Sequence, residues 1–259
     1  MPYYAFAITL LLLAAAVSQA EDRCSADPHW QDGQALAPEF DLLSWNIQKA
    51  GSARWAEDLQ ALAEGVELTL LQEASLQAGI PSLLPERLTA VFAPGFKTNT
   101  MNTGVMTLGV AAPTTHCSYS ALEPWLGTPK AASVSTYALS GRDDRLLAVN
   151  LHAINFSLGL GSLRRQLQPL IAQLADHEGP ALAAGDFNTW SAARQSLVDT
   201  LMASQGLSRV EFIEDLRSKP FGRPLDHVYL RGLTAERAEV VAVESSDHNP
   251  IRLRLAVSP

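Results

Sequence analysis

The sequence predicts an α/β (α+β) fold in which two stacked β-sheets carry helices on their outer faces. Strand-like apolar runs recur evenly along the chain and outnumber the helical ones, and no linker separates two independent units. No internal repeat of 20–50 residues is visible. With 259 residues, 47% of them hydrophobic and 18% charged, the chain is long and apolar enough for one large core.

The first half of the domain reads as strand, helix, strand. Residues 40–48 alternate as a strand does, and residues 52–65 have apolar positions at helical spacing. Ser52 can cap that helix and Gly65 can end it. Residues 66–73 then form an apolar run that predicts a buried strand ending in a carboxylate.

The second half repeats this order with an unrelated sequence. Residues 145–152 predict a strand, residues 162–179 a helix that Pro169 should kink, and residues 180–188 a further strand. Further strands are expected at 223–230, 238–250 and 251–257, and the Gly-, Pro- and Thr-rich residues 86–144 are expected to form short strands and loops.

The N-terminal residues 1–20 predict a signal peptide. An apolar stretch over residues 5–17 is followed by small residues that suit cleavage after Ala20, although no Lys or Arg precedes it. The alternative is an uncleaved anchor, but the stretch is shorter than the roughly 20 residues that a spanning helix needs. We therefore expect a polar tail over residues 21–38, a single domain over 39–259, and a secreted or periplasmic monomer without stable membrane insertion.

The two cysteines bear on the compartment of the protein, and the net charge bears on the kind of substrate it can bind. In an oxidising compartment Cys24 and Cys117 are expected to form a disulfide. The net charge of −8 argues against a surface that tracks nucleic-acid phosphates over a long distance. It does not exclude local action on a phosphodiester, where a divalent cation can supply positive charge.

Polar side chains follow the predicted strands at six places. Each alone has a structural explanation as a turn or cap residue, but together they predict one pocket at an edge of the sandwich. The residues are Asn46, Glu73, His152, the pair Asp186 and Asn188, Asp226, and the pair Asp247 and His248.

The chemistry of this set indicates phosphoester hydrolysis. Carboxylate and carboxamide oxygens are ligands of Mg²⁺, Mn²⁺ or Ca²⁺, whereas the Cys and His patterns of common zinc sites are absent from the sequence. The Gly-x-Ser-x-Gly motif and the phosphate-binding Gly-x-x-x-x-Gly-Lys loop are also absent. Two histidines can act as acid or base, or stabilise phosphate charge.

Six segments in order, SWNIQ, LLQE, VNLHAIN, AGDFNTW, PLDHV and SSDHNP, resemble the endonuclease/exonuclease/phosphatase (DNase-I-like) superfamily. The resemblance covers about residues 40–257, and its details look like a less characterised bacterial branch. It implies a four-layer α/β/β/α sandwich of two packed mixed β-sheets flanked by helices. It also implies a metal-dependent phosphoric ester hydrolase that uses Mg²⁺, with Mn²⁺ or Ca²⁺ as alternatives.

The resemblance implies a role for each matching residue. Glu73 is similar to the principal metal ligand, with Asn46 beside it and Asp247 as an acidic residue on the metal side. Asp186 resembles the residue that orients or deprotonates the attacking water. The remaining assignments are phosphate positioning for Asn188, phosphate or leaving-group contact for His152, a further phosphate contact for Asn155, catalysis for His248, and orientation of the His248 ring for Asp226.

The substrate stays open at this point. A nuclease, a lipid or small-molecule phosphodiesterase, a non-catalytic binding module on the same fold, and a toxin subunit with a partner chain are all considered, and the intact polar set disfavours the binding module. Lys130 is expected to be a plain loop residue and His227 a structural one. His116 and His177 carry no motif and are expected at the surface.

Overall fold

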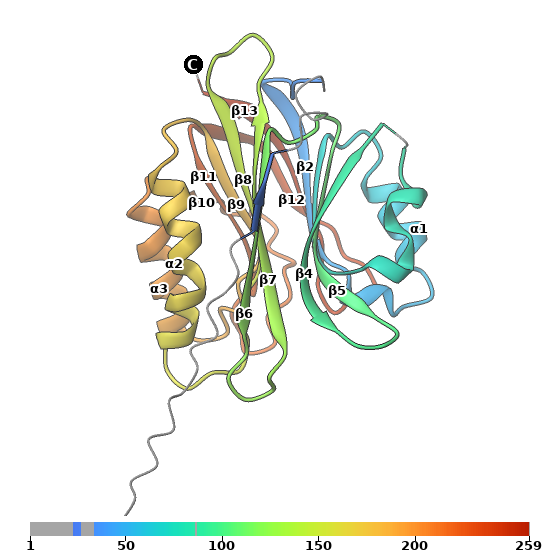
Figure 1. Ribbon diagram of the computed structural model, residues 1–259, viewed down its shortest axis with the longest axis vertical. Helices are drawn as coiled ribbons and strands as arrows, with labels where there is room; N and C mark the ends of the chain where they lie inside the picture. Colours follow the sequence, from blue (N-terminus) through green and yellow to red (C-terminus); the bar gives the residue numbers. More distant parts are fainter. Residues whose placement is uncertain (1–22, 27–33, 86, 259) are drawn as a thin grey trace, which may run out of the picture.

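A computed structural model describes residues 23–26, 34–85 and 87–258 of the chain. Within these ranges the chain forms two stacked mixed β-sheets with helices on both outer faces, so the predicted four-layer sandwich is confirmed (Figure 1). The expected signal peptide lies outside the described residues. In the part of the chain that the structure describes, no helix is long and apolar enough to span a bilayer.

One sheet has six strands in the order β12-β13-β2-β3-β5-β4, and helix α1 (Trp55–Leu62) covers its outer face (Figure 1). Short 3-10 helices η2 (Gln48–Ala50), η3 (Leu76–Ala78) and η4 (Ile80–Leu83) lie in its connections. The strands are β2 (Glu39–Asn46), β3 (Leu68–Ser75), β4 (Thr89–Lys97), β5 (Asn102–Gly109), β12 (Leu233–Val240) and β13 (Ile251–Val257).

The other sheet has seven strands in the order β1-β6-β7-β8-β9-β11-β10, covered by helices α2 (Gly161–Ala175) and α3 (Ala192–Ala203) (Figure 1). Pro169 lies inside α2. The strands are β1 (Arg23–Ser25), β6 (Thr115–Leu122), β7 (Pro129–Ala138), β8 (Arg145–His152), β9 (Ala181–Asp186), β10 (Ser208–Arg209) and β11 (Asp226–Arg231).

Three elements differ from the sequence-based expectations. Helix α3 was not predicted; it begins at Ala192 and is capped by Ser191, whose hydroxyl accepts a hydrogen bond from the Arg194 backbone N–H. Residues 86–144 form four strands of eight to ten residues, longer than expected, because each pairs with a neighbour over its length. The strand expected at 238–250 lies instead at β12, and residues 241–250 form a loop that carries His248.

The core has three apolar layers. One lies between the two sheets and includes Phe40, Leu70 and Leu182. A second packs α2 and α3 against the seven-stranded sheet, and a third packs α1 around Trp45 against the six-stranded sheet. A polar contact crosses between the sheets, where Gln72 Nε2 donates to Asn150 Oδ1 at 2.8 Å. These layers fix the two sheets relative to each other and therefore fix the residues at their shared edge.

The topology brings the predicted polar residues to one edge of the sandwich. Strands β2 and β3 are parallel neighbours, as are β8 and β9, so all four end at the same edge. Strands β11 and β13 run antiparallel to β9 and β2, so both begin there. This edge is called the catalytic edge below.

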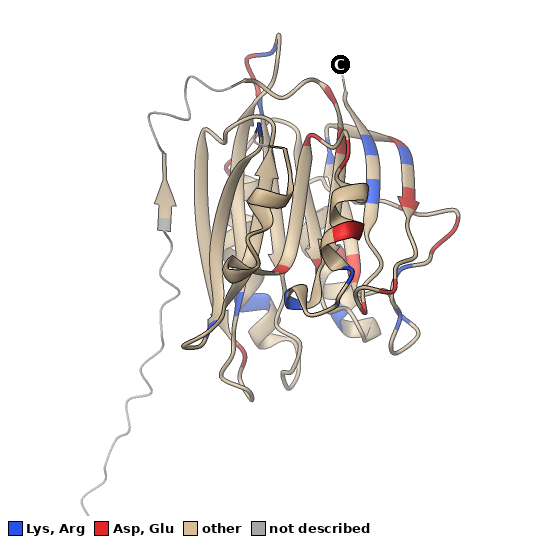
Figure 2. Ribbon diagram, turned by 90° about the vertical axis from the view of Figure 1, so that its right-hand side faces the viewer, with Lys and Arg blue, Asp and Glu red and all other residues tan. Residues whose placement is uncertain are grey.

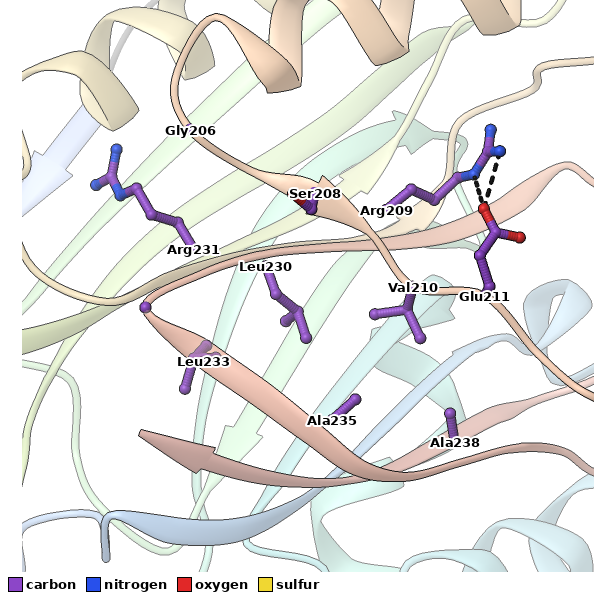
Figure 3. Close-up of a pocket in the computed structure, with 11 residues that line it drawn as sticks. Gly206, Ser208, Arg209, Val210, Glu211, Leu230, Arg231, Leu233, Ala235 and Ala238 are labelled. Atoms are coloured by element: carbon purple, nitrogen blue, oxygen red, sulfur yellow. Dashed lines mark hydrogen bonds and ion pairs between the residues drawn. The ribbon is translucent and has the colours of Figure 1, made fainter. Parts of the chain in front are cut away.

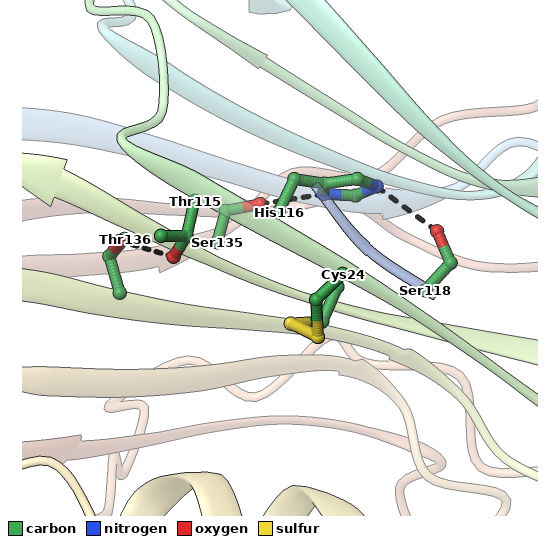
Figure 4. Close-up of a disulfide and its surroundings, with 7 residues drawn as sticks. Cys24, Thr115, His116, Ser118, Ser135 and Thr136 are labelled. Carbon is green, nitrogen blue, oxygen red and sulfur yellow. Dashed lines mark hydrogen bonds between the residues drawn. A yellow bond between two sulfur atoms is a disulfide. The ribbon is translucent and has the colours of Figure 1, made fainter. Parts of the chain in front are cut away.

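Strand β1 joins part of the expected tail to the sandwich. It pairs antiparallel with β6 in a register that puts Cys24 opposite Cys117, and the two sulfurs are bonded (Figure 4). Beside them His116 is buried rather than exposed as expected, with its ring nitrogens hydrogen-bonded to the hydroxyls of Ser135 and Ser118 (Figure 4). The two serine hydroxyls satisfy both ring nitrogens of His116, so the ring is buried without losing hydrogen bonds. Burial lowers the pKa of His116.

Candidate active site

Strand register places three of the predicted residues side by side. His152 at the end of β8 is opposite Asp186 at the end of β9, and Asp186 is opposite Asp226 at the start of β11. Directly paired residues on neighbouring strands project from the same face of a sheet. The imidazole and the two carboxylates therefore lie along one row.

The six-stranded sheet adds Asn46 and Glu73 to the same place. Asn46 Nδ2 donates to Asp186 Oδ2 at 3.2 Å, across the interface between the sheets. His152 Nε2 lies 3.7 Å from Glu73 Oε1 and 3.6 Å from Asp186 Oδ2. Since one imidazole nitrogen is this close to both carboxylates, Glu73 and Asp186 open onto one site.

His248 enters the site from the loop before β13. Its Nδ1 donates to Asp226 Oδ2 at 2.7 Å, while its Nε2 lies 4.0 Å from Asp186 Oδ2. Trp45 Nε1 donates to the His248 carbonyl at 2.8 Å, and the Ser246 hydroxyl accepts from the His248 backbone N–H. The ring is thus oriented by Asp226 and its backbone is held by β2.

The backbone is strained at two of these residues. Glu73 and Asn188 have φ values of 51° and 50°, in the left-handed region that non-glycine residues rarely adopt. At Glu73 the pairing of β3 with β5 shifts between Leu71 and Ala74, which turns the Glu73 side chain toward the site. Strain at two of the predicted residues agrees with the rule that such conformations cluster at functional sites.

The turn after β9 fixes Asp186 and Asn188 to each other. The Asn188 backbone N–H donates to Asp186 Oδ1 at 2.9 Å, and Asn188 Nδ2 donates to the Ala153 carbonyl at 2.8 Å. Before the turn, Gly185 has φ 137°, and a Cβ there would lie 2.1 Å from the Leu151 carbonyl oxygen. Only glycine fits that approach of β9 to β8.

Arg194 on α3 holds this turn from behind, and it lies in no sequence motif that predicts this role. Its side chain is buried, with Nε donating to the Asn188 carbonyl at 2.7 Å and Nη2 donating to the Ile154 carbonyl. Nη1 donates to the Ser157 hydroxyl. Arg194 therefore joins the loop after β9 to the loop after β8.

Two lysines also reach the site. Lys130 was expected to be a plain loop residue, but it lies on β7 with its Nζ 2.9 Å from His152 Nε2. Lys49 Nζ lies 3.6 Å from Glu73 Oε2, on a segment where Gln48, Lys49 and Ala50 all have positive φ. No sequence motif predicts a site role for either lysine, because each reaches the site only through a residue on a neighbouring strand, His152 for Lys130 and Glu73 for Lys49.

His227 behaves as the structural residue that was expected. It is fully buried, and its Nε2 lies 2.7 Å from the Thr189 hydroxyl, which donates to the Pro224 carbonyl. Arg217 Nη1 lies 3.1 Å from His227 Nδ1, so Nδ1 is the acceptor and Nε2 carries the proton. This network ties the turn after β9 to the start of β11.

Two predicted residues are less tightly joined to the cluster. Asp247 is exposed; its carbonyl accepts from the Ser218 hydroxyl, and its carboxylate contacts no other described residue of the cluster. Asn155 lies half-buried on the cavity wall, and its backbone N–H donates to the buried Glu123 carboxylate at 2.7 Å. Glu123 was also missed, because its partners are two backbone N–H groups of a distant loop and the Thr128 hydroxyl.

Burial and neighbouring charges shift the titrations of the cluster. Burial and then the charges of Lys130 and His248 hold the pKa of His152 well below its usual range, so its ring is neutral and Nε2 accepts from Lys130. Burial raises the pKa of Asp186. Burial alone would lower the pKa of His248, but the Asp226 carboxylate and other acidic groups outweigh it and raise that pKa to about 10.

The donors fit a hard divalent cation. Glu73 offers a partly exposed carboxylate that opens to the cavity, and Asn46 offers a carboxamide oxygen that accepts one hydrogen bond from the described residues, from the Gln48 N–H. Such oxygens suit Mg²⁺, Mn²⁺ or Ca²⁺. Among the described residues no three His, Cys, Asp or Glu side chains are grouped so as to hold a metal by themselves.

The cluster opens into a cavity of about 300 Å³ lined by Lys49, Glu73, Lys130, His152 and Asn155, with apolar walls. A second hollow of about 480 Å³ lies between β10, β11 and β12 (Figure 3). There Arg209 and Glu211 form a closed ion pair beside apolar side chains (Figure 3). None of the predicted site residues lines it, so the smaller cavity is the candidate active site.

Comparison with known proteins agrees with this geometry. The family model described as "Endonuclease/Exonuclease/phosphatase family" matches residues 43–248. A UPF0294 protein of Vibrio cholerae is 41% identical over 221 residues, 85% of this chain and 78% of that protein. One of Vibrio vulnificus is 41% identical over 219 residues, 82% of this chain and 75% of that protein.

Solved structures share the fold at low identity. An endonuclease/exonuclease/phosphatase from Beutenbergia cavernae has a TM-score of 0.62 at 15% identity, over 85% of this chain and 72% of that one. TDP2 of D. rerio, humanized by 14 mutations, has a TM-score of 0.63 at 14% identity, over 85% of this chain and 100% of that one. The chain therefore belongs to the endonuclease/exonuclease/phosphatase family, whose members are typically hydrolytic phosphoesterases.

Proposed function

We propose that this chain is an exported, metal-dependent phosphoesterase that hydrolyses phosphodiester or phosphomonoester bonds by in-line attack of water. One observation carries the proposal: side chains from five strand ends and one loop, far apart in sequence, meet in one cluster, and Glu73 and His152 of that cluster line the adjoining cavity. The expected disulfide between Cys24 and Cys117 is consistent with export.

Asp186 and Asn188 are the groups that hold the attacking water. The Asp186 carboxylate is buried and oriented by the Asn188 N–H and by Asn46 Nδ2. Within the described residues no group donates to Asn188 Oδ1, so this oxygen and the carboxylate can accept the two hydrogens of one water. Asp186 then takes a proton as the water attacks phosphorus.

His248 stabilises the charge that develops on the phosphate. Its raised pKa keeps the ring cationic at neutral pH, with Nδ1–H committed to Asp226. At 4.0 Å from Asp186, Nε2–H makes no hydrogen bond there and can donate to a phosphate oxygen. These contacts favour charge stabilisation over base catalysis for His248.

The remaining groups bind and orient the phosphate. Lys130 and the Asn155 carboxamide line the cavity beside His152 and can donate to non-bridging oxygens. Glu73 and Asn46 would hold a divalent cation, which supplies Lewis-acid polarisation of the phosphate when bound. Asp247, beside His248, adds negative charge on that side of the site.

Two substrate classes are supported by different observations. The TDP2 structure complexed with a single-strand DNA product favours a nuclease-like activity for a chain of this fold. The net charge of −8 favours a lipid or small-molecule phosphodiester instead, because long nucleic acids are bound through many basic contacts.

Hydrolysis of bis(p-nitrophenyl) phosphate tests the proposal. We expect turnover that EDTA abolishes and that added Mg²⁺ or Mn²⁺ restores, with Asp199→Asn as a matched carboxylate control because Asp199 bonds Arg209 and Tyr229 outside the cavity. Absence of turnover with either metal, in protein shown to be folded and tested also on a phosphomonoester, would contradict it.

A further inference from the structure

Large apolar side chains are exposed only in one region of the described chain. Nine such side chains are exposed, and all lie on segments that follow or precede strand ends at the catalytic edge. Six of them expose more than half of their surface and are called the apolar rim: Leu122, Trp125, Leu126, Leu158, Ile213 and Phe221. Contiguous or clustered exposure of this kind marks an interaction surface rather than ordinary scatter.

The rim lies at the catalytic edge, and one of its residues lines the cavity. Three of its residues are on the β6–β7 hairpin, one is on the β8–α2 loop after His152, and two are on the β10–β11 loop before Asp226 (Figure 1). Leu126 lines the cavity itself, next to Lys130 and Glu123. A surface that binds through this rim therefore also faces the cavity.

The rim side chains project rather than form a flat patch. Ile213 and Leu158 expose 103% and 80% of their surface, and Trp125 exposes 61%. They stand on three separate loops, and four of the six rim residues are aliphatic. Aliphatic tips can enter the acyl region of a bilayer, whereas nucleic-acid bases are bound by stacking on aromatic rings.

Basic residues accompany the rim although the chain is acidic overall. Lys97, Arg164 and Arg223 are exposed on these loops or beside them, and none forms an ion pair with another described residue. On the β10–β11 loop Asp215 is paired with Arg217 and Lys219, while Glu214 is exposed. Figure 2 shows residues of both signs at this end of the domain, away from the C-terminus. Asp143 and Asp144 lie on the β7–β8 hairpin at the opposite end, because β7 runs away from the catalytic edge. Positive charge beside apolar tips complements an anionic lipid surface.

We propose that the apolar rim inserts into the surface of an anionic lipid bilayer and that the cavity takes its phosphoester from a phospholipid headgroup in that bilayer. The substrate part rests on the proposed phosphoesterase function, whereas the membrane contact does not. The rim anchors the domain with its cavity facing the headgroups, and the basic residues add attraction to anionic lipid.

Sedimentation with sucrose-loaded vesicles tests the membrane contact. The full chain is compared with Trp125→Ser/Leu158→Ser, which removes two rim side chains outside the cavity wall, and with Glu236→Ser/Arg237→Ser on edge strand β12, where both are exposed. Every protein carries the same N-terminal segment, so differences report the rim. Vesicles are phosphatidylcholine with or without phosphatidylglycerol.

We expect the rim variant to lose at least about tenfold in partition onto vesicles, with the β12 variant unchanged and anionic vesicles bound more tightly than neutral ones. Equal partition of wild type and rim variant would overturn the proposal. So would a loss confined to binding of a single-stranded oligonucleotide, which would identify the rim as a base-stacking surface.

Turnover of soluble bis(p-nitrophenyl) phosphate separates the two proposals. The rim variant should cleave it at the wild-type rate and cleave phosphatidylglycerol in vesicles at least about tenfold more slowly, in proportion to lost binding. Wild-type protein that cleaves the soluble diester but no vesicle lipid overturns the substrate assignment and leaves the phosphoesterase function intact. Rim-dependent vesicle binding without cleavage of any phosphoester refutes the function instead.

Discussion

Stability below neutral pH should depend on His227, the buried ring between Thr189 and Arg217. Burial first, and then the Arg217 charge, lower its pKa to about 3. The unfolded chain binds a proton near pH 6.5, and the folded chain does not until about pH 3. Stability from the neutral ring is therefore complete above pH 6.5 and is lost progressively as pH falls toward 3.

The magnitude follows from linkage. With these two pKa values, a single histidine removes about 3 kcal/mol of unfolding free energy between pH 7 and pH 4. That is a large share of the roughly 5–15 kcal/mol typical of a domain. His227→Gln keeps a side-chain amide that can reach the Thr189 hydroxyl but cannot titrate, so it should lose less stability over the same interval.

Urea unfolding at pH 7, 6, 5 and 4 measures the effect. The quantity compared is the change of unfolding free energy with pH, not its value at one pH, because the substitution also alters packing. His177→Gln serves as the control, since His177 is partly exposed at the end of α2 and should leave the wild-type slope. Equal slopes for wild type and His227→Gln would refute the burial argument.

Three further changes test the site. His248→Ala and Asp186→Ala should each lower phosphodiester turnover by at least about a hundredfold with unchanged circular dichroism, and near-wild-type rates would remove them from the mechanism. Arg194→Met should cost about 2–4 kcal/mol in chemical unfolding because two buried carbonyls lose a donor; Arg194→Lys, which can still donate to one of them, should lose less. Gly185→Ala should cost about 3 kcal/mol or more, since its Cβ would meet the Leu151 carbonyl, and a fully stable variant would show that β8 and β9 can separate there.

The sequence predicted the strands whose apolar runs are bounded by polar turns. Strands β2, β3, β8, β9, β11 and β13 lie within a few residues of their expected positions, because each alternates or is continuously apolar. Helix α3 was missed although Leu197, Val198, Leu201 and Met202 recur at helical spacing, because its cap, Ser191, directly follows the GDFNTW motif. The predicted position of strand β12 was displaced along the sequence, because its charged, half-exposed residues do not alternate clearly between apolar and polar. Such a composition is expected of an edge strand.

Site residues were predictable from the sequence where a carboxylate, carboxamide or imidazole stands at a strand end. Site residues in the middle of other elements were missed. Asp186, Asp226 and His152 end or begin strands, so the topology alone brings them into register. Lys130 and Arg194 reach the site along β7 and from α3, and their roles depend on cross-strand and helix contacts that no local pattern encodes.

Titration of Mn²⁺ by electron paramagnetic resonance tests most directly whether distant segments meet around one cation, and it requires no choice of substrate. We expect one Mn²⁺ to bind per chain, with an affinity that Glu73→Gln lowers at least about tenfold and that Glu211→Gln in the second hollow leaves unchanged. Absence of a stoichiometric site, or equal affinity in wild type and Glu73→Gln, would contradict it.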